Sequence, residues 1–203
     1  QNASIIAARA GESIRPVAAL VRDKSKAKEN VKHLKVYDDF DELIENDEID
    51  VFVELIGGVD LPYKMIKKLL SKGKAVVTAN KALLAYHRSE LESLAGEIPF
   101  GFEASVAGGI PIIKALREGL AANHINSITG ILNGTCNYIL TNMMNKGLAF
   151  DEVLKTAQEL GYAEADPSFD VGGFDAAHKL LILASIAYKL DAKPDDILID
   201  GIS

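Results

Sequence analysis

The chain has 203 residues, a formal net charge of −7 and no tryptophan. Its 48% hydrophobic and 25% charged residues are typical of a soluble globular protein and exclude a disordered or membrane-spanning one. The acidic balance argues against nucleic acid or an anionic membrane as a partner, because both need a cationic face.

The single cysteine, Cys136, excludes an internal disulfide and a multi-cysteine zinc site, so we expect a reducing, cytoplasmic compartment. Both ends read as interior to a longer protein. The sequence opens without an initiator methionine in the predicted tail of a helix over 4–10, closed by Gly11, and it stops directly after the apolar residues 197–199. We therefore expect a partial chain.

Short apolar runs alternate with helical patterns in the first half. The continuous run at 16–21 predicts a strand buried on both faces of a parallel sheet, and further strands are predicted at 50–55, 75–78 and 99–102. Helices are predicted between them, at 24–35, 38–44, 62–70 and 88–95. This order predicts an α/β fold with a doubly wound parallel sheet, whose ligands lie at the carboxyl ends of the strands. The turns at Gly57-Gly58, Asn80-Lys81 and Ser105 are therefore expected to line one rim.

The pattern changes near residue 105. A proline in the first turn favours a helix over 112–122, and 125–132 reads as a strand. Further helices are predicted at 136–145, 152–160 and 174–190, with a polar loop over 162–173. We therefore place a nucleotide-binding domain at 1–104 and a mixed α/β substrate domain at 105–203.

A dinucleotide site requires a Gly-x-Gly-x-x-Gly turn, which this sequence does not contain. We expect that turn upstream of the first residue. Arg22 follows the first predicted strand, where a base can accept the 2′-phosphate of NADP and an acid would favour NAD. The adjacent Asp23 leaves the choice open with NADP slightly favoured, and a solvated charge cluster is the alternative.

A group of charged residues near a buried helix carries the clearest chemistry. Asp175 and Lys179 are four residues apart and so share a face of the apolar helix 174–190. Glu164 and Asp175 could hold the Lys179 ammonium at the floor of a cleft, where it would supply the proton that a carbonyl needs as it receives hydride. A structural ion pair between loop and helix is the alternative.

The remaining candidates have simpler explanations. Cys136 fits a small packing residue better than a nucleophile, and His178 is interpreted as structural. Thr135 and Asn133 could contact substrate from a helix N-terminus, although capping explains them equally well. His33, His87 and His124 are scattered and predict no zinc site.

Four linked motifs, in matching order and spacing, resemble homoserine dehydrogenase over nearly the whole chain. They are Val77-Thr78-Ala79-Asn80-Lys81, Glu103 to Pro111, Gly130 to Leu140, and Gly161 to Pro167 with Asp170, Asp175 and Lys179. The resemblance implies a Rossmann-like domain followed by a substrate and dimerisation domain, both incomplete here. It also implies reversible NAD- or NADP-dependent interconversion of L-homoserine and L-aspartate 4-semialdehyde, in threonine, methionine and isoleucine biosynthesis.

The resemblance assigns roles to individual residues. Lys179 matches the proton donor, and Lys81 matches a lysine between nicotinamide and substrate. Glu164 matches the carboxylate that binds the substrate amino group, and Asp175 matches a further contact in that pocket. Cofactor contacts are expected at Lys81, Gly57, Gly58 and Arg22.

The resemblance further implies a monovalent cation, sodium or potassium, bound largely by backbone oxygens at Glu103, Val106, Gly108 and Ile110. It also implies a homodimer formed through the second domain. Two other functions stay open: a non-catalytic nucleotide-binding or regulatory module, and a related amino-acid dehydrogenase.

Overall fold

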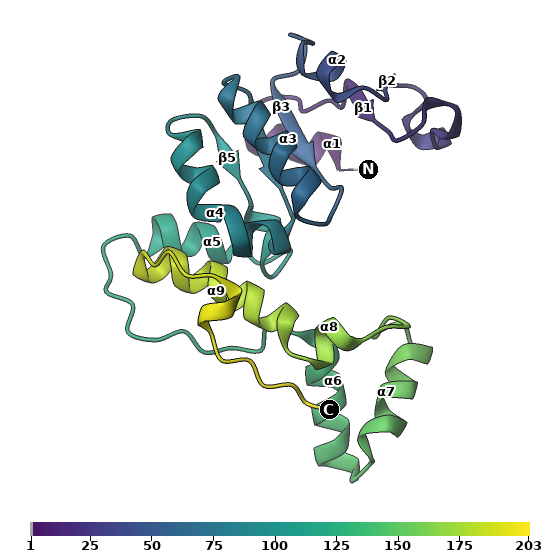
Figure 1. Ribbon diagram of the computed structural model, residues 1–203, viewed down its shortest axis with the longest axis vertical. Helices are drawn as coiled ribbons and strands as arrows, with labels where there is room; N and C mark the ends of the chain where they lie inside the picture. The colour runs from purple at the N-terminus through teal and green to yellow at the C-terminus, as the bar shows by residue number, and fades with distance from the viewer. Residues whose placement is uncertain (1) are drawn as a thin grey trace.

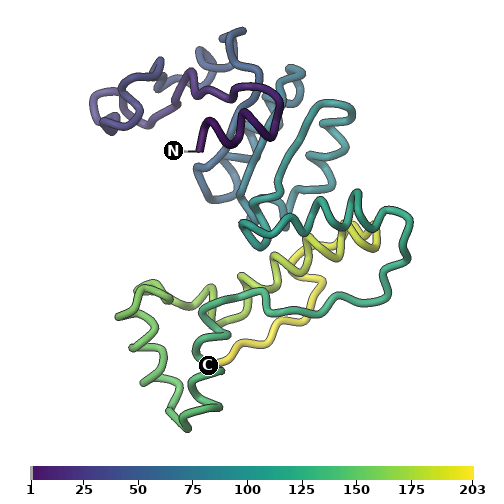
Figure 2. Tube along the Cα trace, turned by 180° about the vertical axis from the view of Figure 1, so that it is seen from behind, coloured from purple at the N-terminus to yellow at the C-terminus, as the bar shows by residue number. Residues whose placement is uncertain are grey.

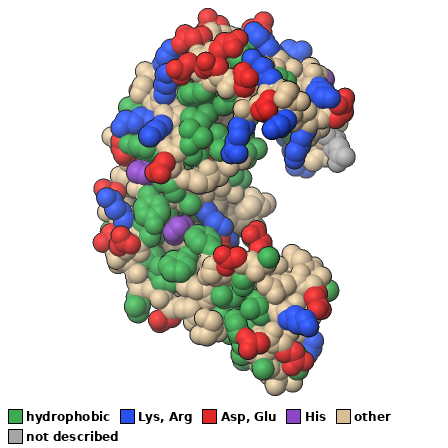
Figure 3. Space-filling model, turned by 45° about the vertical axis from the view of Figure 1, so that its right-hand side comes forward, with side chains coloured by type: hydrophobic (Ala, Val, Ile, Leu, Met, Phe, Trp, Pro, Cys, Tyr) green, Lys and Arg blue, Asp and Glu red, His purple; other side chains and the backbone are tan. Residues whose placement is uncertain are grey.

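A computed structural model describes residues 2–203. The first half is an α/β unit and the second half is helical, and α9 crosses between them, as both ribbon and trace show (Figures 1 and 2). The space-filling view shows the molecule hollowed on one side, between the upper and lower parts (Figure 3).

All strand pairs are parallel. β1 (Ala18–Leu20) pairs with β2 (Lys35–Tyr37), and a second sheet has the order β3 (Val51–Glu54), β4 (Ala75–Thr78), β5 (Phe100–Gly101). The register sets Glu54 beside Thr78, so the carboxyl ends of β3 and β4 lie level. The predicted α/β class with parallel strands is confirmed.

The helices of the first half are α1 (Ala3–Ala10), α2 (Phe40–Ile44), α3 (Asp60–Ser71) and α4 (Lys81–Ala95). α3 and α4 pack against each other and the sheet through side chains that are fully buried, namely Ile66, Val76, Leu83 and Leu91. α4 begins well before the predicted residue 88, because the Asn80 side chain accepts the Leu83 N–H at 3.1 Å and caps the helix.

The second half contains α5 (Ile112–Lys114), α6 (Gly134–Lys146), α7 (Phe150–Glu159), α8 (Ser168–Val171) and α9 (Phe174–Tyr188). α5 continues as a π-helical turn over Ala115–Gly119, and 3-10 turns lie at Glu103–Ser105 and Pro194–Asp196. α9 packs on α4 through a core that includes Leu84, Phe102, Ile182 and Ile186. A separate core joins α6, α7 and α8 around Ile139 and Val153.

Two predicted elements are wrong. The helix expected over 24–35 forms 3-10 turns at Lys24–Lys26 and Glu29–Val31, followed by β2, which the sequence did not suggest. This segment has too few apolar residues to pack a helix face, and packing is what stabilises short helices. The strand expected over 125–132 pairs with no strand in the described residues; its Ile128 and Leu132 pack instead against the α4–α9 core. The second half is therefore helical where a mixed α/β domain was expected.

No helix within residues 2–203 has both the length and the apolar content needed to cross a membrane.

Ile66 supplies a stability test, because its side chain is fully buried between α3 and the sheet. We expect Ile66→Ala to lower the free energy of unfolding by about 2–5 kcal/mol in urea titrations, from lost burial and the cavity left behind. Met144→Ala on α6 is the control: this side chain is 85% exposed, so the change should stay within about 0.5 kcal/mol. Equal effects from the two substitutions would contradict the assignment of the core.

Candidate active site

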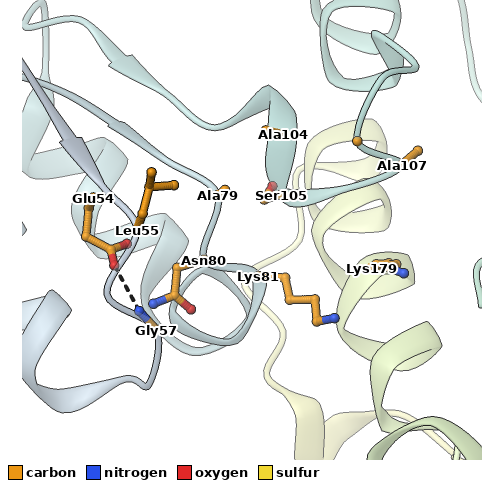
Figure 4. Close-up of a pocket in the computed structure, with 11 residues that line it drawn as sticks. Glu54, Leu55, Gly57, Ala79, Asn80, Lys81, Ala104, Ser105, Ala107 and Lys179 are labelled. Carbon is orange, nitrogen blue, oxygen red and sulfur yellow. Dashed lines mark hydrogen bonds between the residues drawn. The ribbon is translucent and has the colours of Figure 1, made fainter. Parts of the chain in front are cut away.

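A cavity of about 500 Å³ lies at the carboxyl ends of β3 and β4. Glu54 and Gly57 lie on one side and Lys179 of α9 on the other, with Asn80 and Lys81 between them (Figure 4). Ser105 and Ala107 lie at the upper edge (Figure 4), and Gly108 also lines the cavity. The cavity thus joins turns of the sheet to a helix from the far end of the chain.

A buried carboxylate organises the sheet side of the cavity. Glu54 accepts the Thr78 hydroxyl at 2.5 Å and the backbone N–H groups of Ile56 at 2.7 Å and Gly57 at 3.3 Å. The Asn80 side chain donates to the Gly58 carbonyl at 2.7 Å, which ties the turn after β3 to the turn after β4. Both Gly57 and Gly58 have positive φ angles, 81° and 74°, which glycine adopts without steric cost.

Asp175 is the centre of the helical side. Its side chain is only 3% exposed, and it accepts hydrogen bonds from the ammonium groups of Lys81 and Lys179, the latter at 2.7 Å, and from the Asn133 amide at 2.8 Å. Burial raises the pKa of this carboxyl, but the hydrogen bonds from Lys179, Lys81 and Asn133 outweigh it, so the pKa lies below its ordinary value. Asp175 thus holds two ammonium groups at this side of the cavity.

Lys179 has one donor left for a ligand. Its ammonium donates to Asp175 and to the Leu132 carbonyl at 2.9 Å, and an ammonium has three N–H groups. Because Lys179 lines the cavity, the third N–H is available to a bound oxygen atom. Lys81 also lies 5.6 Å from the centre of the Phe169 ring, within cation–π distance.

Glu164, the second carboxylate expected beside Lys179, is exposed in the loop before α8 and forms no ion pair with Lys179 in the described structure. Its backbone carbonyl accepts the Gln158 side chain at 3.1 Å. Of the two predicted partners, therefore, only Asp175 holds Lys179.

Only two of the four residues expected to contact the cofactor line the cavity. Gly57 and Lys81 line the cavity, whereas Arg22 and Gly58 are not among its lining residues. Asp23 caps the turn at Lys24–Lys26, and Lys24 pairs with Asp38 at 2.9 Å, so these two neighbours of Arg22 are engaged in local contacts. Arg22 itself is exposed.

The loop expected to bind a cation runs along the upper edge of the cavity. The Glu103 carboxylate accepts the backbone N–H groups of Ile113 and Lys114, both at 2.9 Å, and so holds the start of α5. Val106 is buried, Ile110 is exposed, and Gly108 has a φ of 53°. Within residues 2–203 no three His, Cys, Asp or Glu side chains gather as a metal site. Any ion here would thus depend on backbone oxygens.

The structural interpretations of the minor candidates agree with their contacts. The Cys136 thiol lies 3.1 Å from the Asp170 carbonyl, and burial raises its pKa, which disfavours the thiolate. His178 packs edge-on against Tyr86 and Phe169, and burial lowers its pKa. Asn133 caps α6 by accepting the Cys136 N–H at 2.7 Å, and Thr135 donates to the Tyr162 carbonyl at 2.7 Å.

Sequence reasoning placed Asn80 at the rim, as found, but missed Glu54. Glu54 ends an otherwise apolar run, and a carboxylate at the end of a buried strand is the signal that could have identified it. The contact between Lys81 and Asp175 has no local signal, because 94 residues separate them.

A parallel sheet, a cavity at the carboxyl ends of its strands and basic side chains at that cavity define the doubly wound, nucleotide-binding class of α/β proteins. Comparison with models of protein families identifies the family within this class. The model "Homoserine dehydrogenase, NAD binding domain" matches residues 2–99, and the model "Homoserine dehydrogenase" matches residues 111–203. The chain belongs to the homoserine dehydrogenase family.

Individual relatives agree with this assignment. The homoserine dehydrogenase of Helicobacter pylori is 58% identical over the whole chain and that of Pseudomonas aeruginosa 51%, the chain covering 48% and 47% of them. The crystal structure of a homoserine dehydrogenase from Thiobacillus denitrificans superposes with a TM-score of 0.90 at 49% identity, over all of this chain and 47% of that one. The chain thus spans about half the length of the curated relatives it matches.

A more distant structure contains a ligand. A hyperthermophilic archaeal homoserine dehydrogenase mutant in complex with NADPH superposes with a TM-score of 0.71 at 35% identity, over 82% of this chain and 53% of that one. Together with the NAD-binding family model, this neighbour supports NAD(P) binding by the first half of the chain.

The buried position of Asp175 predicts a pH-dependent contribution to stability. Asp175→Asn removes the charge that faces two ammonium groups, and we expect the free energy of unfolding at pH 7 to fall by about 1–3 kcal/mol. This is less than for a fully buried pair, because the Lys81 and Lys179 side chains are 33% and 21% exposed.

Since the pKa of Asp175 is lowered by folding, its contribution is present above the ordinary carboxyl pKa of about 4 and is lost as the pH falls through the lower, folded value. The gap in unfolding free energy between the wild type and Asp175→Asn should therefore begin to narrow as the pH falls below about 4 in urea titrations. The exposed pair of Asp47 and Lys74 is the control, with Asp47→Asn expected to change little. A gap between wild type and Asp175→Asn that stays the same size from about pH 7 to about pH 3 would contradict the ionic explanation.

Proposed function

We propose that this chain carries the nicotinamide and substrate sites of a homoserine dehydrogenase, which interconverts L-homoserine and L-aspartate 4-semialdehyde with NADP or NAD. The observation that carries the proposal is the pair of lysine ammonium groups, from α4 and α9, held on one buried carboxylate at the cavity. Family membership supplies the reaction class.

The cavity fits a nicotinamide cofactor, because it opens at the carboxyl ends of parallel strands and Gly57 brings backbone to its wall. When bound, the cofactor supplies or accepts the hydride. Gly57, Gly58 and Lys81 would hold its nicotinamide end, and Arg22 would meet a 2′-phosphate. This arrangement favours NADP over NAD.

Lys179 acts on the substrate oxygen. During reduction of the aldehyde, that oxygen gains negative charge and must receive a proton, and the free N–H of Lys179 both stabilises the charge and supplies the proton. Asp175 and the Leu132 carbonyl fix the ammonium in place, so little reorganisation is needed as charge develops. Lys81, on the other side of Asp175, orients substrate and nicotinamide relative to each other.

Glu164 would bind the substrate ammonium group. Its carboxylate is exposed and free of an ion pair with Lys179, so it could pair with a cationic ligand. A monovalent cation, sodium or potassium, would bind along Glu103, Val106, Gly108 and Ile110. Both Glu103 oxygens already accept backbone N–H groups, so the ion would depend on carbonyl oxygens, which suit such hard cations.

The proposal also covers the oligomeric state, the cellular compartment and the pathway. A homodimer formed through the second half fits the exposed apolar side chains there, Leu198 among them. The single cysteine fits a cytoplasmic enzyme, and the reaction would serve threonine, methionine and isoleucine biosynthesis.

The reaction is tested by absorbance at 340 nm after the full-length protein is mixed with L-homoserine and NADP. We expect a rise for wild type and a kcat about 10²–10⁴-fold lower for Lys179→Ala, because the proton donor is lost. Lys155→Ala, at an exposed position of α7, should match wild type. Wild-type turnover by Lys179→Ala would eliminate the proton-donor role, and NADPH binding without any turnover by wild type would favour a non-catalytic module.

Cofactor choice is tested separately at Arg22. If its guanidinium meets the 2′-phosphate, Arg22→Ala should weaken NADPH binding about tenfold and leave NADH binding unchanged, as measured by fluorescence titration. Arg9→Ala on exposed α1 serves as a charge-matched control. An equal loss for both cofactors would argue against contact with the 2′-phosphate.

A further inference from the structure

Asn133 lies beside the lysine–carboxylate cluster with only 7% of its surface exposed. Its side-chain oxygen accepts the Cys136 N–H at 2.7 Å and caps α6. Because that oxygen must face a donor, the orientation of the amide is fixed and its NH₂ group faces the site.

The NH₂ group of Asn133 bridges two carboxylates. It donates to Asp170 of α8 and to Asp175 of α9, both at 2.8 Å. An amide nitrogen carries two hydrogens, and each finds one carboxylate oxygen. One neutral side chain therefore joins α6, α8 and α9 at the point where two negative charges meet.

Leu132, the residue before Asn133, contacts Lys179, which pairs with Asp175 on α9. The Leu132 carbonyl accepts the Lys179 ammonium at 2.9 Å, while Asn133 donates to Asp175, the partner of that ammonium. Leu132 and Asn133 thus each hold one partner of the ion pair between Lys179 and Asp175.

The groups around Asp175 show what the amide does there. Its charged and titratable neighbours are Lys81 from α4, Lys179 and His178 from α9, Asp170 from α8 and Cys136 from α6. Both lysines contact Asp175 directly, whereas Asp170 reaches it only through the Asn133 amide. Without that donor, two carboxylates would face each other, and like charges disfavour ionisation of both.

We propose that Asn133 is a positioning residue whose amide separates Asp170 from Asp175 and holds Asp175 ionised toward both lysines. Its effect on turnover rests on the proposed function, whereas its effect on the ionisation of Asp175 does not. The competing explanation is that Asn133 only caps α6.

Asp and Ser cap helices about as well as Asn, so substitutions at this position separate the two explanations. Asn133→Asp keeps the shape and the cap but replaces the donor by a third carboxylate. Asn133→Ser keeps the cap and removes the donor without adding charge. If capping were the whole role, both variants would behave like wild type.

The primary experiment follows the Asp175 side-chain carboxyl by ¹³C NMR during a pH titration of the full-length protein. We expect the apparent pKa of Asp175 to rise by about one pH unit or more in Asn133→Asp, and by less in Asn133→Ser. In the 340 nm assay, kcat of Asn133→Asp should fall about tenfold or more with KM for NADP unchanged, and the acid limb of the kcat profile should move to higher pH. Asp39→Asn is the control, because it exchanges Asp for Asn at the cap of α2, away from the site. It should change neither the pKa of Asp175 nor kcat.

An unchanged Asp175 titration in Asn133→Asp would overturn the proposal and leave capping as the role of Asn133. If that variant does not fold, Asn133→Ser decides by the same criterion. If wild type fails to reduce NADP with homoserine, the proposed function fails, and the NMR titration still decides the role of Asn133.

Discussion

The site depends on one buried carboxylate that receives two ammonium groups. A carboxylate as buried as Asp175 is costly unless it is paired and fully hydrogen-bonded, and here Lys81, Lys179 and Asn133 meet that requirement. Lys81 belongs to the first half of the chain and the other two to the second half. The ion pair therefore requires α9 to lie against α4, which the shared apolar core of these helices ensures. Packing and electrostatics specify the same arrangement.

The cavity brings two ammonium groups together although the chain as a whole is acidic. The protein carries a net charge of −7, yet two ammonium groups face one carboxylate at the helical wall. On the sheet side, Glu54 is occupied by the Thr78 hydroxyl and by backbone N–H groups. These hydrogen bonds fix the shape of the turn after β3. An acidic protein can thus place an ammonium donor where negative charge develops on a ligand.

The sequence predicts elements well where a local pattern decides them. The strands β3 and β4 follow from apolar runs, although Val51 and Val53 on one face of β3 are exposed. The pairing of Asp175 with Lys179 follows from helical spacing. The sequence predicts elements and contacts poorly where they depend on residues far away in the chain. Three-residue β2 exists because β1 lies beside it, and the contact of Lys81 with Asp175 exists because α4 and α9 pack together. Glu164 was expected beside Lys179 on proximity in sequence, but the loop before α8 leaves it exposed.

The strand that does not form at 125–132 helps to explain the site. In a sheet, backbone carbonyls are used by the ladder of hydrogen bonds between strands. Here the segment forms no strand, so the Leu132 carbonyl at its end can accept the Lys179 ammonium, while Leu132 and Ile128 still bury apolar surface against the core. A buried carbonyl needs a donor, and a buried ammonium needs acceptors. The same apolar residues that made this segment look like a strand hold it in place, and its unpaired backbone becomes part of the lysine site.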